Sequence, residues 1–308
     1  MDPLSDVLSL LRPLSQVSGG LDAGGAWAIR YGRYEGIKCY AVLAGSCWLR
    51  VQGVRRPVRM DAGDCFLLPR GCSFVLASTL SVRPVPADEV WANARHGDVL
   101  RCGCGSELFL VGSHFDLGRE HGAMLLGALP PVIRVREAAA RDVLAWSIQR
   151  MRQELGERRP GSALMVQHLG NMILVQALRQ YLVDENAGGA NWLRALGDTQ
   201  IGAAITAMHE APERAWTLPQ LAKIASMSRS VFALRFHEKV GVTPRAYLTR
   251  WRMLLAAERL TTSRDVIATV ASSLGYESES AFSLAFKKVL GSSPRRYALR
   301  RRASRATE

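Results

Sequence analysis

Hydrophobic and polar positions follow different patterns in the two halves of the chain. From Trp27 to about Val111, short apolar runs such as IKCYAVLAG and SFVLAS are separated by glycine-containing turns. Runs of this length and spacing are typical of antiparallel strands in a small barrel or jelly roll. Farther along, helical spacing predicts two helices, at about residues 137–154 and 163–184, and more helices follow them. The pattern therefore predicts an α+β chain with a strand-rich first part and a helical second part.

The second part contains a 20-residue repeat without a gap. The segments SRSVFALRFHEKVGVTPRAY at 228–247 and SESAFSLAFKKVLGSSPRRY at 278–297 are identical at nine positions. Ser228 and Ser278 precede the periodic runs and are expected to be N-caps. Each copy then has two phenylalanines on one helical face, a glycine that ends the helix and a proline that begins the next. These structural positions are Phe232, Phe236, Gly241 and Pro244 in the first copy and Phe282, Phe286, Gly291 and Pro294 in the second.

Another helix is predicted before each copy. Thr217 and Gln220 form a capping box that begins LPQLAKIA, and DVIATVASSL at 265–274 is its counterpart. Only two or three residues separate each helix from the next. Two helices joined by so short a turn are typical of a helix-turn-helix, so the sequence predicts such units at about 217–241 and 265–291.

The second helix of each predicted unit has an outward face suited to the major groove of DNA. Basic side chains on or beside it are candidate phosphate contacts: Arg229, Arg245, Lys287, Lys288, Arg295 and Arg296. The candidate base or sugar contacts are Ser230, Ala233, Leu234, Glu279, Ser280, Ser283 and Leu284, and His237 also faces outward. A protein-binding helical repeat is the alternative interpretation, although such repeats usually need three or more copies.

Charge supports the nucleic-acid interpretation because it is unevenly distributed. The whole chain of 308 residues carries a formal charge of +13. From Asp198 onward, 18 Lys and Arg oppose 9 Asp and Glu, a net of +9, so most of the basic excess lies on the repeat. Phosphate binding requires such an excess, although an ordinary basic surface would give the same count.

The remaining composition indicates a cytoplasmic protein. No run approaches the roughly 18 apolar residues of a membrane span, and Asp2 and Asp6 lie where a signal peptide needs basic charge. Six cysteines without regular spacing fit free thiols in a reducing compartment. Cys102 and Cys104 could hold a metal or respond to oxidation, but ordinary free cysteines are the simpler interpretation.

One motif in the strand-rich part resembles a known fold. The segment GDCFLLPRG at 63–71 resembles the second half of the cupin signature. Catalytic cupins hold a metal with histidines and a carboxylate, but no histidine occurs here between Trp27 and Val90, and Phe74 stands where one is expected. We therefore predict a cupin-like β-barrel without catalytic residues, metal or cofactor, whose apolar interior binds a small organic ligand. A filled barrel that serves only as a scaffold is the alternative.

The helix at 163–184 carries two apolar stripes. One runs through Val166, Leu169, Ile173, Ala177 and Tyr181, and the other through Met165, Met172, Val175, Leu178 and Leu182. The first stripe is enough to pack the helix on the barrel, and the second predicts either a partner subunit or burial on two sides. The polar DENAGGAN at 184–191 is a predicted linker. It divides the chain into a sensing and dimerisation domain at 1–190 and a DNA-binding domain at 191–308.

Taken together, the chain resembles the AraC/XylS family of transcription regulators, in the subgroup with a cupin-like N-terminal domain. The resemblance rests on GDCFLLPRG, on LPPVIRV near Leu129, on LVQALRQYL near Leu174, and above all on VASSLGYESESAFSLAFKKVLGSSPRRY. It implies tandem helix-turn-helix units, bridged by one helix at about 244–260, that occupy successive major grooves of duplex DNA. It also implies an activator that responds to a small-molecule effector, forms a homodimer and acts on RNA polymerase. An effector-independent regulator or a cupin enzyme with a helical appendage are the alternatives.

Leu234 and Leu284 depart from the family pattern, since many members carry arginine at these outward positions. Arginine can contact guanine or phosphate, whereas leucine can only pack on a thymine methyl or a sugar. The sequence therefore predicts either a binding site rich in A·T contacts or weak base discrimination.

Overall fold

The chain divides into two compact units, which are described separately here. The computed structural model describes residues 2–11, 14–94, 98–116, 129–135, 138–157, 159–183, 192–263 and 265–305. One unit comprises Arg12–Ala187, and the other joins Met1–Leu11 to Gly188–Glu308. The sequence assigned residues 1–190 to a single N-terminal domain, whereas here the first helix belongs to the C-terminal unit. The predicted linker at 184–191 lies outside the described residues.

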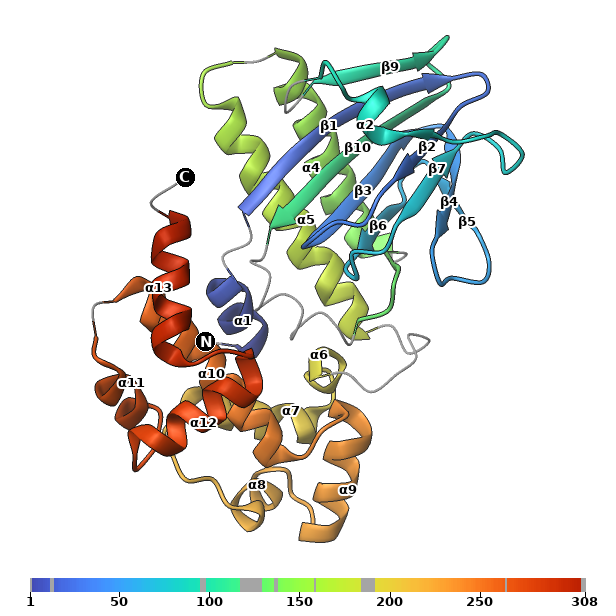
Figure 1. Cartoon of the computed structure of the whole chain (residues 1–308). Helices are drawn as coiled ribbons and strands as arrows, with labels where there is room; N and C mark the ends of the chain where they lie inside the picture. Colours follow the sequence, from blue (N-terminus) through green and yellow to red (C-terminus); the bar gives the residue numbers. More distant parts are fainter. Residues whose placement is uncertain are drawn as a thin grey trace. The chain divides into compact units, whose positions relative to one another are not determined.

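Two β-sheets form most of the unit Arg12–Ala187 (Figure 1). The six-stranded sheet has the order β11-β6-β3-β10-β1-β9, and the five-stranded sheet the order β5-β4-β7-β2-β8. The first contains β1 (Leu14–Gly24), β3 (Ile37–Ala44), β6 (Cys65–Leu68), β9 (Val99–Gly103), β10 (Leu108–Asp116) and β11 (Ile133–Val135). The second contains β2 (Ala28–Tyr31), β4 (Ser46–Val51), β5 (Val58–Asp61), β7 (Phe74–Ala77) and β8 (Val85–Pro86). Among the described strands, only β1–β9 and β2–β8 pair in parallel.

The strand-rich domain predicted from the sequence is present, but its described strands do not close into a barrel. Both sheets contribute to one hydrophobic core, which includes Tyr40 and Phe66 from the first sheet and Leu49 and Phe74 from the second. The edge strands β8 and β11 are short, with two and three residues. They therefore have few backbone N–H and C=O groups with which to join the two sheets. The result is two sheets packed on a shared core.

Two helices cover the outer face of the six-stranded sheet (Figure 1). They are α4 (Ala138–Glu157) and α5 (Ser162–Val183), and α5 contacts β1, β6 and β11. The first apolar stripe of α5 is buried as predicted, with Val166 and Ile173 each 3% exposed. In the second stripe, Met165 is 44% exposed, whereas Leu178 is buried and the other members are half-buried. Most of the second stripe therefore has cover within its own unit.

The other unit is entirely helical among its described residues. Its helices are α1 (Pro3–Leu11), α6 (Trp192–Ala195), α7 (Thr199–Glu210), α8 (Leu218–Ile224), α9 (Arg229–Val240), α10 (Pro244–Thr262), α11 (Ile267–Ser273), α12 (Glu279–Leu290) and α13 (Pro294–Arg305). The pairs α8–α9 and α11–α12 each pack together, and α10 contacts members of both pairs. In the described part of the chain, no helix combines the length and hydrophobicity that a membrane span requires.

Local sequence signals determine where these helices begin and end. Thr217 and Gln220 form the reciprocal capping box that the sequence predicted for α8. Ser228 and Ser278 cap α9 and α12 through their hydroxyl groups. Both of these helices end at a left-handed glycine, with φ of 83° and 73°. By contrast, α11 begins at Ile267, two residues later than expected, and its N-cap residue offers no side-chain hydrogen bond.

The predicted phenylalanines form the centres of the two repeated cores. Phe236 lies edge-on to Tyr247 with ring centroids 6.0 Å apart, and Phe286 has the same relation to Tyr297 at 5.5 Å. Phe236 and Phe286 are fully buried, and Tyr297 is too. Buried residues of α10 such as Met253 join the second core. The long bridging helix predicted at 244–260 is therefore present and extends to Thr262.

The first helix, α1, completes the helical unit. It contacts α7 and α10, and its side chains Leu4 and Val7 are only 7% and 3% exposed. Asp6 also lies within this contact, with its Oδ2 3.5 Å from Nδ1 of His209. His209 in turn stacks on the Trp251 ring of α10 at a centroid distance of 3.9 Å. The N-terminal helix α1 is thus part of the helical core.

Candidate nucleic-acid interface and ligand pocket

The helices α9 and α12 have almost the same succession of buried and exposed positions. In both, the two phenylalanines point inward and the leucine midway between them points outward. Leu234 is 63% exposed and Leu284 72%, so both leucine side chains are available for contact with a partner. The matching positions arise because both helices follow the same sequence repeat and the same capping serines.

Most of the predicted contact residues lie on the surface of the helical unit. Ala233 and Ser283 are half-buried, so they can contribute only part of their surface. The exposed members are Arg229, Ser230, Leu234, His237, Arg245, Glu279, Ser280, Leu284, Lys287, Lys288, Arg295 and Arg296. Val231, which was not predicted as a contact residue, lies in the first turn of α9 and is 51% exposed. Its outward position follows from the same helical rotation that identified Ser230.

Two arginines of the repeat lie at helix beginnings. Arg245 and Arg295 directly follow the prolines that begin α10 and α13. The hydroxyl groups of Thr243 and Ser293 cap these helices by accepting hydrogen bonds from backbone N–H groups. A helix N-terminus carries a partial positive charge, and a nearby arginine adds a full one. This combination favours an anion such as a DNA phosphate.

Arg235 has a structural role that the sequence did not reveal. It donates hydrogen bonds to Gln200 at 2.9 Å and to Asp198 at 3.0 Å, which joins α9 to the beginning of α7. Burial acts to raise the pKa of Asp198, but backbone hydrogen bonds from Ile201 and Gln200 and the charge of Arg235 lower it overall. Arg235 therefore stabilises the position of α9 through its partners in α7.

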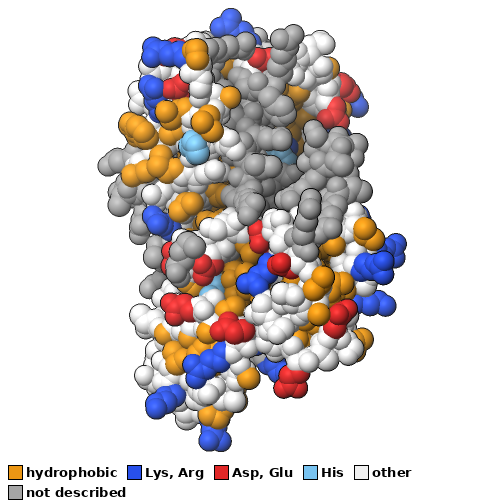
Figure 2. Space-filling view, turned by 90° about the vertical axis from the view of Figure 1, so that its left-hand side faces the viewer, with side chains coloured by type: hydrophobic (Ala, Val, Ile, Leu, Met, Phe, Trp, Pro, Cys, Tyr) orange, Lys and Arg blue, Asp and Glu red, His pale blue; other side chains and the backbone are white. Residues whose placement is uncertain are grey.

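Basic side chains do not form one continuous block on the face shown in Figure 2. Lysine and arginine (blue) alternate there with hydrophobic (orange) and acidic (red) side chains. On this face, side chains of both charges are therefore interspersed. Dispersed lysine and arginine contacts to successive phosphates are the usual source of affinity in DNA-binding proteins.

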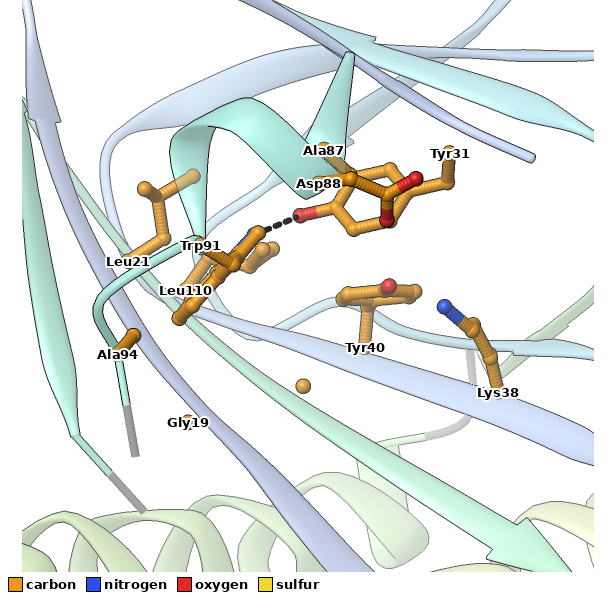
Figure 3. Close-up of a pocket in the computed structure, with 11 residues that line it drawn as sticks. Gly19, Leu21, Tyr31, Lys38, Tyr40, Ala87, Asp88, Trp91, Ala94 and Leu110 are labelled. Carbon is orange, nitrogen blue, oxygen red and sulfur yellow. Dashed lines mark hydrogen bonds between the residues drawn. The ribbon is translucent and has the colours of Figure 1, made fainter. Parts of the chain in front are cut away.

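A pocket with a volume of about 280 Å³ lies between the inner face of the six-stranded sheet and α2 (Ala87–Val90) (Figure 3). Its walls include Leu110 and the rings of Tyr31, Tyr40 and Trp91. The Trp91 Nε1–H donates a hydrogen bond to the Tyr31 hydroxyl at 3.4 Å. Burial raises the pKa of Tyr31 to about 12, so its phenol is neutral. The mainly apolar walls agree with the sequence-based expectation for this domain.

One cation in the pocket was not predicted. The Nζ atom of Lys38 lies 4.9 Å from the centroid of the Tyr31 ring, 5.0 Å from that of Tyr34 and 5.6 Å from that of Phe74. Burial lowers the pKa of Lys38, and the charge of Asp88 partly opposes this effect. Phe74, where a catalytic cupin would carry a histidine, is thus part of an aromatic cluster around an ammonium group.

Among the described residues, no group of three or more His, Cys, Asp or Glu is placed to hold a metal ion. Cys102 is half-buried, and burial raises the pKa of its thiol, whereas Cys104 is exposed. Cys39 and Cys65 are buried, with their sulfurs 3.6 Å apart. The contact with Cys65, together with burial, raises the pKa of Cys39, which keeps this thiol protonated and unreactive.

Residues 2–183 match the Cupin family, and residues 221–301 match the Helix-turn-helix domain family. The chain is 41% identical over 280 residues to an AraC-like transcription regulator of Streptomyces lividans, which covers 91% of this chain and 92% of that protein. It is 29% identical over 264 residues to the HTH-type transcriptional regulator AlkR of Acinetobacter baylyi, covering 83% and 85% of the two chains. Among solved structures, the DNA-binding domain of AdpA in complex with a target DNA is 32% identical, with a TM-score of 0.33, and covers 35% of this chain and 96% of that chain.

Proposed function

Because the chain belongs to the AraC family of DNA-binding transcription regulators, we propose that α8–α9 and α11–α12 act as two helix-turn-helix units. In each unit the second helix enters the major groove of duplex DNA. The repeated outward face of α9 and α12 is the observation that carries this proposal, since two helices with the same exposed positions suit the same task. The helix α10 contacts both pairs and sets the distance between them, so the two recognition helices occupy successive grooves.

Within this arrangement, the exposed basic residues contact phosphates. Arg229, Lys287 and Lys288 project from the recognition helices, and Arg245, Arg295 and Arg296 from the helices that follow. Each phosphate contact releases condensed counterions, which makes the affinity depend on salt and not on sequence. These residues fix the orientation of the protein on the duplex, and the outward face provides discrimination between bases.

Base recognition is expected to be mainly apolar. Leu234 and Leu284 occupy the centres of the outward faces and have no hydrogen-bonding atoms in their side chains. A leucine in the major groove can pack on the methyl group of thymine, but it cannot distinguish guanine by hydrogen bonds. Ser230, Ser280 and Glu279 supply the neighbouring polar contacts. We therefore propose a binding site whose central positions favour A·T pairs.

The cupin domain is proposed to bind a small-molecule effector that regulates DNA binding. The pocket beside α2, with its aromatic walls, supports this assignment. Activation of transcription through RNA polymerase and the formation of a homodimer follow from the family resemblance and stay predictions. The side chains Val143 and Trp146 on α4 and Leu164 and Met165 on α5 are exposed apolar groups that are available for self-association.

The first experiment is selection of bound genomic fragments by the purified full-length protein at two salt concentrations. We expect a recurring motif of two short blocks about one helical turn apart, with affinity that falls as salt rises. Leu284→Glu should abolish enrichment because it places a negative charge against the groove. Leu80→Glu is the matched control, since Leu80 is 46% exposed and lies in the unit Arg12–Ala187. Affinity for duplex DNA that does not depend on salt would contradict the proposed function.

A further inference from the structure

Lys38, the cation in the cupin pocket, lies on the face of β3 whose other positions carry apolar core residues. Lys38 and Tyr40 are two residues apart on β3, so their side chains extend to the same face of the sheet. Tyr40 and the next residue in this series, Val42, are both part of the hydrophobic core. Lys38 is half-buried at the edge of this core and lines the pocket. Figure 3 shows its ammonium group directed toward the ring of Tyr40.

This ammonium group has aromatic neighbours but no bound carboxylate among the described residues. Rings of Tyr31, Tyr34 and Phe74 surround it at centroid distances of 4.9 to 5.6 Å. Aromatic faces attract a cation, but they do not supply the charged hydrogen-bond acceptor that an ammonium group binds most strongly. Asp88 lines the pocket on α2 and is exposed, and it forms no ion pair with Lys38. An anion that enters the pocket would therefore gain a direct contact with an available cation.

The aromatic cluster is also the wrong receptor for a cationic ligand. Recognition of ammonium ligands uses an empty cage of aromatic rings. Here the side chain of Lys38 already lies over the rings of Tyr31, Tyr34 and Phe74. A second positive charge would be repelled by the first, so the pocket selects against cations.

Two glycines give the pocket flat walls. A Cβ atom at Gly112 would lie 2.8 Å from Cε1 of Tyr40, so the tyrosine ring can lie against β10 only because residue 112 has no side chain. A Cβ atom at Gly19 would lie 2.4 Å from the carbonyl oxygen of Asp98 and 3.3 Å from Cζ3 of Trp91. The rings of Tyr40 and Trp91 consequently border a space suited to a planar molecule. Its volume of about 280 Å³ is at the lower end of the roughly 300–1,000 Å³ usual for ligand pockets.

On the basis of the effector site assigned above, we propose that this pocket binds a small aromatic monocarboxylate. The carboxylate contacts the ammonium group of Lys38, and the ring packs against Tyr40 and Trp91. The negative charge of Asp88 at the side of the pocket disfavours a ligand with a second carboxylate. The site therefore distinguishes an aromatic acid from its neutral amide and from the corresponding diacid.

The test compares ligands that differ only in charge, by calorimetric titration of the full-length protein. The probes are benzoate with benzamide, 2-naphthoate with 2-naphthamide, and 2,6-naphthalenedicarboxylate. We expect at least one monocarboxylate to bind about tenfold more tightly than its amide, the ratio that one charge-assisted hydrogen bond provides, and more tightly than the diacid. Quenching of Trp91 fluorescence should accompany binding, and a Trp91→Phe variant should lose most of this signal.

Variants identify the groups responsible. Lys38→Met should remove the preference for the carboxylate over the amide, and Lys38→Arg should retain it. Lys223→Met is the matched control, because Lys223 is exposed on α8 in the other unit, and it should bind as the unchanged protein does. Asp88→Asn gives a second test at an exposed position, and it should raise the affinity for the diacid severalfold.

Equal affinity for a carboxylate and its amide would overturn the assignment, and so would a failure of every monocarboxylate to bind. Carboxylate binding that survives Lys38→Met would also overturn it. Affinity for duplex DNA is measured on the same samples. A failed DNA measurement therefore argues against the proposed function, whereas a failed titration argues only against the ligand class.

Discussion

At the scale of single residues, the turn between α8 and α9 and the turn between α11 and α12 each contain a residue with left-handed backbone, but the residue type differs. Ser226 and Gly275 both have left-handed backbone, with φ of 51° and 76°. This conformation costs a residue with a Cβ atom about 1–2 kcal/mol, whereas glycine adopts it freely but loses about 0.5–1 kcal/mol more chain entropy on folding. At Gly275, a Cβ atom would also lie 2.0 Å from the carbonyl oxygen of Glu213.

The two turns should therefore respond in opposite directions to substitution. Ser226→Gly is expected to raise the free energy of unfolding by about 0.5 kcal/mol, because relief of backbone strain exceeds the entropy loss. Gly275→Ala is expected to lower it by about 3 kcal/mol, since strain and steric overlap add. Urea denaturation followed by circular dichroism measures both. Gly291→Ala is the control for strain alone, because its φ is 73° and nothing lies near the new Cβ, and Gly275→Ala must be the more damaging of the two.

His209 makes the helical unit sensitive to acid. Burial lowers its pKa to about 3, and its Nε2 shares a hydrogen bond of 2.8 Å with the hydroxyl of Tyr247. The carboxylate of Asp6 lies 3.5 Å from Nδ1 and would favour protonation if ionised, but burial raises the pKa of Asp6 as well. Desolvation is therefore the larger effect, and the folded protein holds His209 neutral.

The unfolded chain takes up a proton at His209 near pH 6.5, whereas the folded chain resists it down to about pH 3. Stability from this residue is thus complete above pH 6.5 and falls by about 1.4 kcal/mol per pH unit below it. We expect His209→Gln to be less stable at pH 7 but to have a flatter stability profile between pH 6.5 and 4, measured by urea denaturation at each pH. The exposed His237→Gln is the control. An unchanged slope in His209→Gln would show that another group causes the acid sensitivity.

At the scale of elements, the outward faces of α9 and α12 are the surfaces proposed to set base preference. Leu234→Arg and Leu284→Arg should each shift preference at one position toward guanine, because arginine can donate two hydrogen bonds to its major-groove edge. We expect discrimination to change by about 1–3 kcal/mol for each good contact, measured as a base-by-base binding profile. Leu299→Arg adds the same charge on α13 and should raise affinity without changing the profile. Unchanged profiles for both groove variants would refute the assigned outward face.

The elements that follow and end the recognition helices should act on affinity alone. Arg245→Ala or Lys288→Ala should weaken binding to all duplexes by similar factors and flatten the dependence of log K on log salt by about one unit each. Titrations of a specific and a random duplex at several salt concentrations measure this. Loss of affinity confined to one base pair would contradict the phosphate assignment.

Elements defined by local chemistry were predictable from the sequence. The capping box of Thr217, the glycine at the end of each recognition helix and the two inward phenylalanines all lie where the pattern placed them. Closure of the sheets was not predictable, because it depends on whether distant edge strands pair. The position of Lys38 in the pocket was not predicted either. The alternation of side chains along β3 indicates which face of the sheet Lys38 is on. The aromatic rings of Tyr31, Tyr34 and Phe74, however, come close to Lys38 only in the folded chain.

At the scale of the whole molecule, the placement of α1 is the largest difference from the sequence prediction. Its apolar positions Leu4 and Val7 predict a helix with one buried face, but they do not identify the surface that buries it. The helices that contact α1 are α7 and α10. In the sequence, the entire strand-rich unit lies between them and α1. Long-range pairing of this kind leaves no local pattern, so the linker predicted at 184–191 placed these residues in one domain with the strands that follow them.

Loss of this contact should weaken the helical unit specifically. Val7→Asp places a carboxylate at a position that is 3% exposed, which costs several kcal/mol unless the helix detaches. Hydrogen exchange followed by mass spectrometry should show faster exchange in α7 and α10, with the strands of the other unit unchanged. Ser9→Asp is the control, because it adds the same charge at an exposed position of α1. Equal exchange in the two variants would mean that α1 contributes little to the unit.

The contact of α1 with α7 and α10 can form only after most of the chain has been synthesised. Ribosomes release α1 first and α13 last, so the helix that completes the DNA-binding unit waits with its apolar face uncovered until α7 and α10 have been made. A polypeptide released early, after the cupin domain, would retain this uncovered face and become a substrate for chaperones and proteases. The cell would thereby remove incomplete copies that lack the helical DNA-binding unit.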